Sequence, residues 1–264
     1  MQKVKHGSRI AKQGFANEKD MVKVFNSWRE NNNAAILLQI MGYNLDELES
    51  VQAKKVPGTL KPDIKVFIKA GGKIDCHRIS CKRVEKKANY NHLCRKSVDK
   101  YQSQWGFNTL VSESLKAFTG ELKLVEHNLL RSGLGLLRDQ KKDRPARRLF
   151  MDEIKDEARD AIVSFFEKNT QGIVQEVFQG TNSEEIPDWM LFTYIEDDTC
   201  TYHLYPMQEV VDFYTGNADV SITKGGNLNI GKITLQRKGG TGNPFDMQFK
   251  FRPLTFLENN NERL

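Results

Sequence analysis

The residues best suited to chemistry lie in one stretch, KPDIKVFIKAGGKIDCHRISCKRV, in the first third of the chain. Polarity alternates on both sides of Gly71-Gly72, and two glycines between alternating segments indicate a β-hairpin. With these glycines as the two central turn residues, Asp63 lies directly opposite Ser80. Opposed side chains have Cβ atoms about 4.5–5.5 Å apart, and Lys82, two residues further, points to the same face. The hairpin therefore predicts a carboxylate, a hydroxyl and an ammonium group side by side.

This combination of groups suits hydrolysis of a phosphodiester bond. Mg²⁺ binds proteins through one or two carboxylates, with waters and phosphate oxygens completing its shell. Asp63 is the expected ligand, the backbone carbonyl of Cys81 is a second oxygen, and the hydroxyl of Ser80 is a weaker one. The metal ion activates water and neutralises charge on the phosphate. Lys82 can orient the attacking water or stabilise the transition state.

Two neighbouring features are weaker candidates. A second Pro-Asp dipeptide, Pro187-Asp188, precedes MLFTYIEDD but has no lysine at strand spacing after it, so we interpret it as part of a loop. His77 has an odd number on the second strand of the hairpin. It is therefore expected to face away from Ser80 and Lys82.

The pattern along the rest of the chain predicts the elements that hold the hairpin. Apolar spacing favours helices over 15–28, with Asn17 as cap, over 34–41, ending at Gly42, and over 45–51. A turn and a helix are expected over 85–107, and helices over 112–166, including an amphipathic one over 151–166. A basic run over 141–148 interrupts them. Beyond about residue 173 the segments VQEVF, MLFTYI, TYHLYP, NIGKITLQRKGG and MQFKFRP favour strands.

These elements predict an α/β fold. A central mixed sheet contains the 61–84 hairpin and is flanked by helices, with a β-rich C-terminal portion alongside it. We expect a single domain over 1–264, with a catalytic core over 1–172 and the β-rich portion over 173–264.

Composition sets broad limits on the class of protein. The 264 residues are 39% hydrophobic and carry a formal net charge of +6, which permits a nucleic-acid partner without proving one. No stretch approaches the ~20 apolar residues of a membrane span, and no secretory signal is evident. The 4 cysteines suggest no disulfide framework, so the expected location is the cytoplasm.

Pro62-Asp63 followed by Ser80-Cys81-Lys82 resembles the PD-(D/E)XK motif of a large nuclease family. In that motif an aspartate binds metal, a second position supplies another ligand, and the lysine is catalytic. Ser80 departs from the usual acidic residue, which puts a second metal ion in doubt. The family often adds a glutamate from an N-terminal helix, and Glu18 matches that place.

Five segments in order extend the resemblance to type II restriction endonucleases that cut GCGC. They are GFANEKD at 14–20, MGYNLDELESV at 41–51, FTGEL at 118–122, RRLFMDEI at 147–154 and ITLQRKGG at 233–240. The resemblance implies a restriction-endonuclease-like fold and Mg²⁺-dependent double-strand cleavage at a short palindrome. Its implied partners are double-stranded DNA and, as a genetic partner, a cognate cytosine-5 DNA methyltransferase.

The resemblance also places DNA recognition in the segment after the catalytic lysine and in the QRKGG strand. The implied DNA-binding residues are Arg83, Lys86, Lys87, Asn89, Asn91, His92, Arg95, Lys96, Gln236, Arg237 and Lys238. Arginine, lysine, glutamine and asparagine are the side chains that read base edges. Two alternatives stay open: a DNA-binding protein of this fold that does not cut, and a structure-selective repair nuclease.

Overall fold

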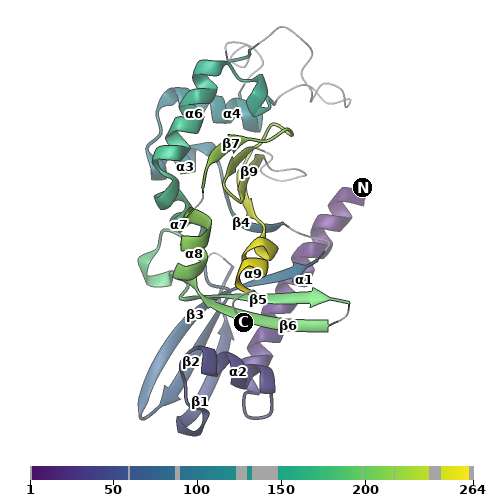
Figure 1. Cartoon of the computed structure of the whole chain (residues 1–264), viewed down its shortest axis with the longest axis vertical. Coiled ribbons are helices and arrows are strands. Elements are labelled where there is room, and N and C mark those ends of the chain that lie inside the picture. The colour runs from purple at the N-terminus through teal and green to yellow at the C-terminus, as the bar shows by residue number, and fades with distance from the viewer. Residues whose placement is uncertain are drawn as a thin grey trace. The chain divides into compact units, whose positions relative to one another are not determined.

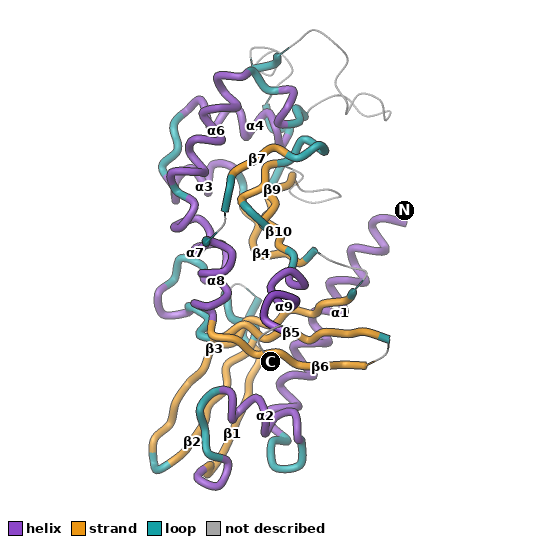
Figure 2. Tube along the Cα trace, in the orientation of Figure 1, coloured by secondary structure: helices purple, strands orange, loops and turns teal. Residues whose placement is uncertain are grey.

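In the described part of the chain, the strands form two five-stranded sheets. Figures 1 and 2 show the arrangement of the elements within each sheet. A computed structural model describes residues 2–58, 60–86, 90–122, 130–132, 148–197, 199–216, 218–237 and 245–261, with side chains described from residue 12 to residue 260. Contacts divide the chain into two units. Unit one is Met1–Asn91, Phe178–Phe213 and Pro253–Leu264, and unit two is His92–Val177 and Tyr214–Arg252.

The sheet of unit one is mixed, as the sequence predicts. Its strands, in spatial order, are β1 (Leu48–Lys55), β2 (Ile64–Ala70), β3 (Lys73–Glu85), β5 (Trp189–Glu196) and β6 (Thr199–Pro206). Only the β3–β5 pair is parallel. The ranges 1–172 and 173–264 therefore both contribute strands to this sheet.

The β2–β3 hairpin has the predicted register. Ala70 pairs with Lys73 across a turn in which Gly71 and Gly72 have φ angles of 55° and 76°. Both angles lie in the left-handed region, which glycine adopts without a steric penalty. At the other end of the hairpin, Ile64 pairs with Ile79.

Strand β3 changes partner at Ile79. Up to this residue it runs antiparallel to β2, and from this residue on it runs parallel to β5, beginning with the pair Ile79–Trp189. Strand β2 begins at Ile64, so the ladder on that side of β3 ends there. The backbone N–H of Asp63 still donates to the Ile79 carbonyl, at 2.9 Å. Ser80, Cys81 and Lys82 thus lie on β3 just beyond its last residue paired with β2, which is Ile79.

Helices cover both faces of the mixed sheet, as expected. Helices α1 (Gln2–Asn26) and α2 (Asn32–Ile40) pack on the face that carries Val66, Ile79 and Cys81. Helix α9 (Pro253–Asn261) packs on the other, where the Phe256 ring lies 5.8 Å from that of Phe192 on β5. Because strand side chains alternate, Ser80 and Lys82 point to the side opposite α1.

Unit two holds the second sheet, with helices beside it. Its strands, in spatial order, are β4 (Asn91–Lys96), β10 (Met247–Phe251), β9 (Ile233–Arg237), β8 (Leu228–Ile230) and β7 (Val220–Ile222). Its helices are α3 (Val98–Trp105), α4 (Thr109–Thr119) and α6 (Asp156–Lys168). Helices α7 (Thr170–Gln179) and α8 (Met207–Thr215) and the 3₁₀ turns η1 (Leu45–Glu47), η3 (Met151–Glu153) and η4 (Ser183–Glu185) complete the described elements. The β-rich C-terminal portion is confirmed.

Two predicted elements have the wrong type. The segment 45–51 was expected to be helical, but only η1 is, and the chain enters strand β1 at Leu48. Its residues are good helix formers, yet pairing along β2 overrides that preference. The segment VQEVF was expected to be a strand, but it lies inside helix α7. In and next to this segment, residues 173, 174, 177 and 178 are buried. A spacing of three to four residues between buried positions is that of one helix face.

Smaller differences concern boundaries. Asn17 does not cap a helix, because α1 begins at Gln2 and Asn17 is buried within it. The range 85–107 contains strand β4 before the expected helix, which is α3. Gly42 follows α2 with a φ of 92°, as a residue ending a helix does. The basic run lies outside the described residues except for Arg148.

Candidate active site

Three contacts converge on one oxygen of Asp63. The Ser80 hydroxyl donates to Asp63 Oδ2 at 3.1 Å, and the backbone N–H of Cys81 donates to the same oxygen at 2.6 Å. Lys82 Nζ lies 3.6 Å from it. The hairpin register explains the convergence, because it sets Ser80 beside Asp63 and turns Lys82 to the same face. The structure thus brings together the carboxylate, hydroxyl and ammonium groups that the sequence placed on one hairpin.

The site combines a buried support with two accessible charged groups. Ser80 is 1% exposed, whereas the side chains of Lys82 and Asp63 are 18% and 24% exposed. The Cys81 side chain points into the core on the α1 side. Burial, and then the charge of Asp63, raise the pKa of the Cys81 thiol well above its usual value. The thiol therefore stays protonated, and only the backbone of Cys81 serves the site.

The donor set matches a hard divalent cation. All three contacts end on Oδ2 of Asp63, which fixes the carboxylate and leaves Oδ1 outside them. Within the described ranges no cluster of three or more His, Cys, Asp or Glu side chains could hold a metal ion. A single carboxylate with a hydroxyl and a backbone carbonyl suits Mg²⁺, whose shell waters and phosphate complete, and does not suit zinc.

Glu18 lies close to this site on the other side of the sheet. Its carboxylate pairs with Lys55 at 2.7 Å and is 14% exposed. Its charge is the last of the causes that raise the pKa of the Cys81 thiol. In the described part of the chain no hydrogen bond or ion pair joins Glu18 to Asp63. A catalytic role for Glu18 stays a prediction.

His77 faces away from the site, as its position on the strand predicts. Its Nε2 lies 2.6 Å from the Tyr43 hydroxyl, and the Trp189 indole N–H donates to its Nδ1 at 3.2 Å. Both partners pack against the core on the α1 side. Burial lowers the pKa of His77, so its imidazole is neutral and structural.

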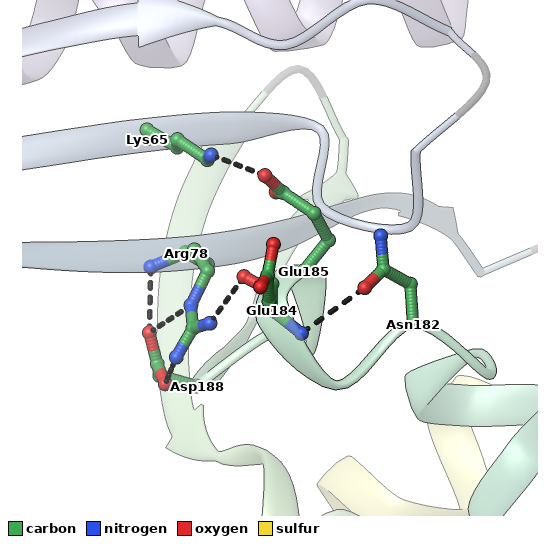
Figure 3. A network of polar contacts seen from close by, with 6 residues as sticks. All are labelled: Lys65, Arg78, Asn182, Glu184, Glu185 and Asp188. Atoms are coloured by element: carbon green, nitrogen blue, oxygen red, sulfur yellow. Dashed lines mark hydrogen bonds and ion pairs between the residues drawn. The ribbon is translucent and has the colours of Figure 1, made fainter.

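The second Pro-Asp dipeptide lies in a loop, as interpreted, but it also anchors the catalytic strand. Asp188 accepts the backbone N–H of Arg78 at 2.8 Å and two guanidinium bonds at 3.1 and 2.8 Å (Figure 3). The Asp188 N–H donates to the Arg78 carbonyl. Arg78 was not recognised from the sequence. The signal available in the sequence was that Arg78 lies two residues from Ser80 on one strand, so the two side chains point to the same face of the sheet.

The candidate DNA-binding residues fall into several groups. Arg83 donates to Glu85, Lys86 to Glu196, and Lys96 to Glu176 and Gln104, while Arg95 pairs with Asp246 at 3.4 Å. Asn91, His92, Arg95 and Lys96 lie on β4, and Gln236 and Arg237 lie on β9. Lys87, Asn89 and Lys238 lie outside the described residues. Strand β10 stands between β4 and β9, so the β4 part of the first recognition segment shares a sheet with β9. Arg83 lies on β3, in the other sheet.

Arg237 has a distinctive setting at the end of β9. Its guanidinium carbon lies 3.8 Å from the centre of the Phe150 ring and 5.6 Å from that of Phe118. Stacking on an aromatic ring holds a guanidinium in a fixed direction. Arg237 is therefore oriented before any ligand arrives, and its role in reading DNA stays a prediction.

Comparison with known proteins assigns the class. The fold is that of a restriction endonuclease: a crystal structure of restriction endonuclease MspI in complex with its cognate DNA is similar, with a TM-score of 0.61 and 13% identity over 94% of this chain and 92% of that one. The family model of the R.HinP1I restriction endonuclease matches residues 41–257. The chain belongs to this family, and it is a type II site-specific deoxyribonuclease that binds double-stranded DNA.

Three further observations accompany this assignment. The matched range includes Asp63, Ser80, Lys82 and both expected recognition segments, and it excludes Glu18. No curated protein sequence matches the chain. In the described ranges no helix has the length and apolar character to cross a membrane.

Proposed function

We propose that this endonuclease cuts both strands of a short palindrome, GCGC, in a reaction that requires Mg²⁺ and is catalysed by Asp63, Ser80 and Lys82. The observation that carries the catalytic part is the convergence of three donors on Asp63 Oδ2. The GCGC site rests on the resemblance of five ordered sequence segments to enzymes with that specificity, HhaI among them. A cognate cytosine-5 methyltransferase follows from the same resemblance.

The residues of the chain divide the work as follows. The Ser80 hydroxyl and the Cys81 N–H hold the carboxylate of Asp63 in one direction, so that Oδ1 and the Cys81 carbonyl are available to Mg²⁺. Bound Mg²⁺ supplies a polarised water and neutralises charge on the phosphate. Lys82, beside Asp63, orients the attacking water and donates to the phosphate oxygens as negative charge grows on them.

Recognition is assigned to β4, β9 and the segments next to them. Arg237 is the leading candidate for a guanine, because a guanidinium can donate two bonds to O6 and N7 in the major groove. Arg83, Lys86, Lys87 and Lys96 are proposed as phosphate contacts. Asn89, Asn91, His92, Arg95, Gln236 and Lys238 are the remaining proposed contacts.

The test is cleavage of a plasmid and of short duplexes containing GCGC, with Mg²⁺ and with EDTA. We expect cutting at GCGC in Mg²⁺, no cutting in EDTA, and protection by cytosine-5 methylation of the site. Binding without cutting at any Mg²⁺ concentration would favour a DNA-binding protein in which Ser80 has replaced an essential ligand. Cutting that follows branches or mismatches rather than sequence would favour a repair nuclease.

A further inference from the structure

Lys82 and Arg78 occupy equivalent positions around the catalytic hydroxyl. Each lies two residues from Ser80 on β3, so both point to the face of Asp63. Each is a diagonal cross-strand neighbour of Asp63, at a Cβ separation of about 7–8 Å that a long side chain can span. Only Lys82 approaches the carboxylate, at 3.6 Å. Strand geometry alone therefore does not decide which cation reaches Asp63.

A third cation lies within the same reach. Lys65 pairs with Arg78 across the hairpin and is two residues from Asp63 on the same face. The rung that contains Lys65 and Arg78 thus carries two positive charges next to the rung that contains Asp63 and Ser80. Either ammonium or guanidinium group, if free, could pair with the Asp63 carboxylate in place of a metal ion.

The segment 182–188 engages both cations, as Figure 3 shows. Asp188 accepts two bonds from the Arg78 guanidinium, whose remaining arm donates to the Glu184 carbonyl at 2.8 Å. Lys65 Nζ lies 2.7 Å from Glu185 Oε1. The Asn182 side chain accepts the N–H of Glu184 at 3.1 Å and shapes this turn. The pair formed by Arg78 and Asp188 is about one-third exposed, so exchange for another partner is accessible.

We propose that Asp188, with Glu185 in support, is a positioning residue that withholds Arg78 and Lys65 from Asp63. Its role is to leave Lys82 as the cation that faces the carboxylate and to keep the other carboxylate oxygen open to the metal ion. The inference rests on the proposed catalytic role of Asp63 and Lys82. It predicts that losing the Asp188 charge weakens metal binding through Arg78, and not through damage to the fold.

The test compares Asp188→Asn with the double variant Asp188→Asn/Arg78→Gln. Asparagine keeps the oxygen that accepts the backbone N–H and the Nε–H of Arg78. It removes the negative charge and the second acceptor, which weakens the hold on the guanidinium. We expect Asp188→Asn to raise the Mg²⁺ concentration for half-maximal cutting, and the Ca²⁺ dissociation constant measured by calorimetry, by about 10-fold or more. Removal of the released cation by Arg78→Gln should restore both values to near those of the wild type.

The matched control is Glu49→Gln, on β1 beside the turn end of the hairpin. Glu49 pairs with Lys69 and accepts the N–H of Gly72 at 2.8 Å, so it too joins a lysine and a backbone amide. Its loss should leave the metal requirement unchanged. If Asp188→Asn does not fold, Glu185→Gln with and without Lys65→Gln provides the same comparison with a smaller expected effect.

The outcomes separate this inference from the proposed function. An unchanged metal requirement in Asp188→Asn, or a defect that Arg78→Gln fails to reverse, overturns the inference and leaves a purely structural clamp. This result overturns the inference alone, and not the proposed function, when the wild-type protein needs Mg²⁺ and Lys82→Ala is inactive. Cutting by Lys82→Ala would instead overturn the site assignment itself.

Discussion

The catalytic pair proposed on the hairpin and the β4 cations proposed for recognition in unit two obtain their partners differently. Lys82 faces Asp63, a residue of the same hairpin. On β4, Lys96 pairs with Glu176, 80 residues away, and Arg95 pairs with Asp246. The proposed catalytic pair is thus assembled within one hairpin, although Lys65 and Arg78 of the same hairpin pair with the distant residues Glu185 and Asp188. The β4 cations proposed for recognition depend on distant carboxylates throughout. If Arg95 and Lys96 contact DNA as proposed, DNA displaces those carboxylates, so mutations should affect the two regions in different ways.

The largest effect is expected from removing the catalytic groups. Lys82→Ala and Asp63→Asn should each slow cutting at least about 10²–10³-fold, because each removes a charge that acts on the transition state. Specific binding measured in Ca²⁺ should remain, and Asp63→Asn should bind DNA at least as tightly, since a negative charge beside phosphate is lost. A Lys82→Ala protein that cuts at the wild-type rate would contradict the assignment.

Next in size is the loss of a base contact in the sheet of unit two. If Arg237 forks onto guanine, Arg237→Ala should cost roughly 1–3 kcal/mol of discrimination between GCGC and a one-base variant. Binding should be measured in Ca²⁺ at several salt concentrations, with Gln236→Ala as the neighbouring control. Equal losses on both DNAs would show that Arg237, stacked on Phe150, serves structure or backbone contact rather than reading.

A smaller effect is expected from the hydroxyl that supports the carboxylate. Ser80→Ala removes one donor to Asp63 Oδ2, while the Cys81 N–H and Lys82 keep their contacts. We expect about a 10-fold loss of rate, partly restored by extra Mg²⁺. The measurement is single-turnover cutting across a Mg²⁺ titration. A loss as complete as that of Asp63→Asn would mean that Ser80 ligates the metal ion directly.

The smallest effect is expected from removing the carboxylate that neutralises Arg95 on β4. Asp246→Asn should free Arg95 from its partner, whose side chain is only 13% exposed. Non-specific DNA binding should strengthen, and the salt dependence should rise by about one released counterion. The cutting rate at saturating DNA should not change. An unchanged salt slope would place Arg95 away from the phosphates.

The sequence could predict features that depend on neighbouring residues, but not those that depend on contacts between distant ones. The hairpin register, and with it the meeting of Asp63, Ser80 and Lys82, depends on a two-glycine turn and alternation, which are local. The Arg78–Asp188 contact joins residues 110 positions apart, and nothing near either residue indicates the other. Strand β1 was missed for a related reason, since pairing with β2, and not its helix-forming residues, decides its structure.

The expected strand at VQEVF failed for a different reason. Val174, Val177 and Phe178 are residues common in strands, but their spacing buries them on one side of helix α7. The residues proposed for recognition could be predicted from the sequence only in part. Their chemistry is visible in the sequence, while the sheet order that sets β10 between β4 and β9 is a property of the whole unit.

The end of the β2 ladder has a consequence for hydrogen exchange. Beyond that end the amide proton of Cys81 is held by the carboxylate of Asp63 at 2.6 Å rather than by a strand neighbour. The exchange of this proton with solvent is limited by how often the hydrogen bond to the Asp63 carboxylate opens. A ligand that draws Asp63 aside exposes this proton, and one that uses only the other carboxylate oxygen leaves it protected. One backbone amide next to the catalytic lysine therefore reports which oxygen of Asp63 is in use, without any cut in DNA.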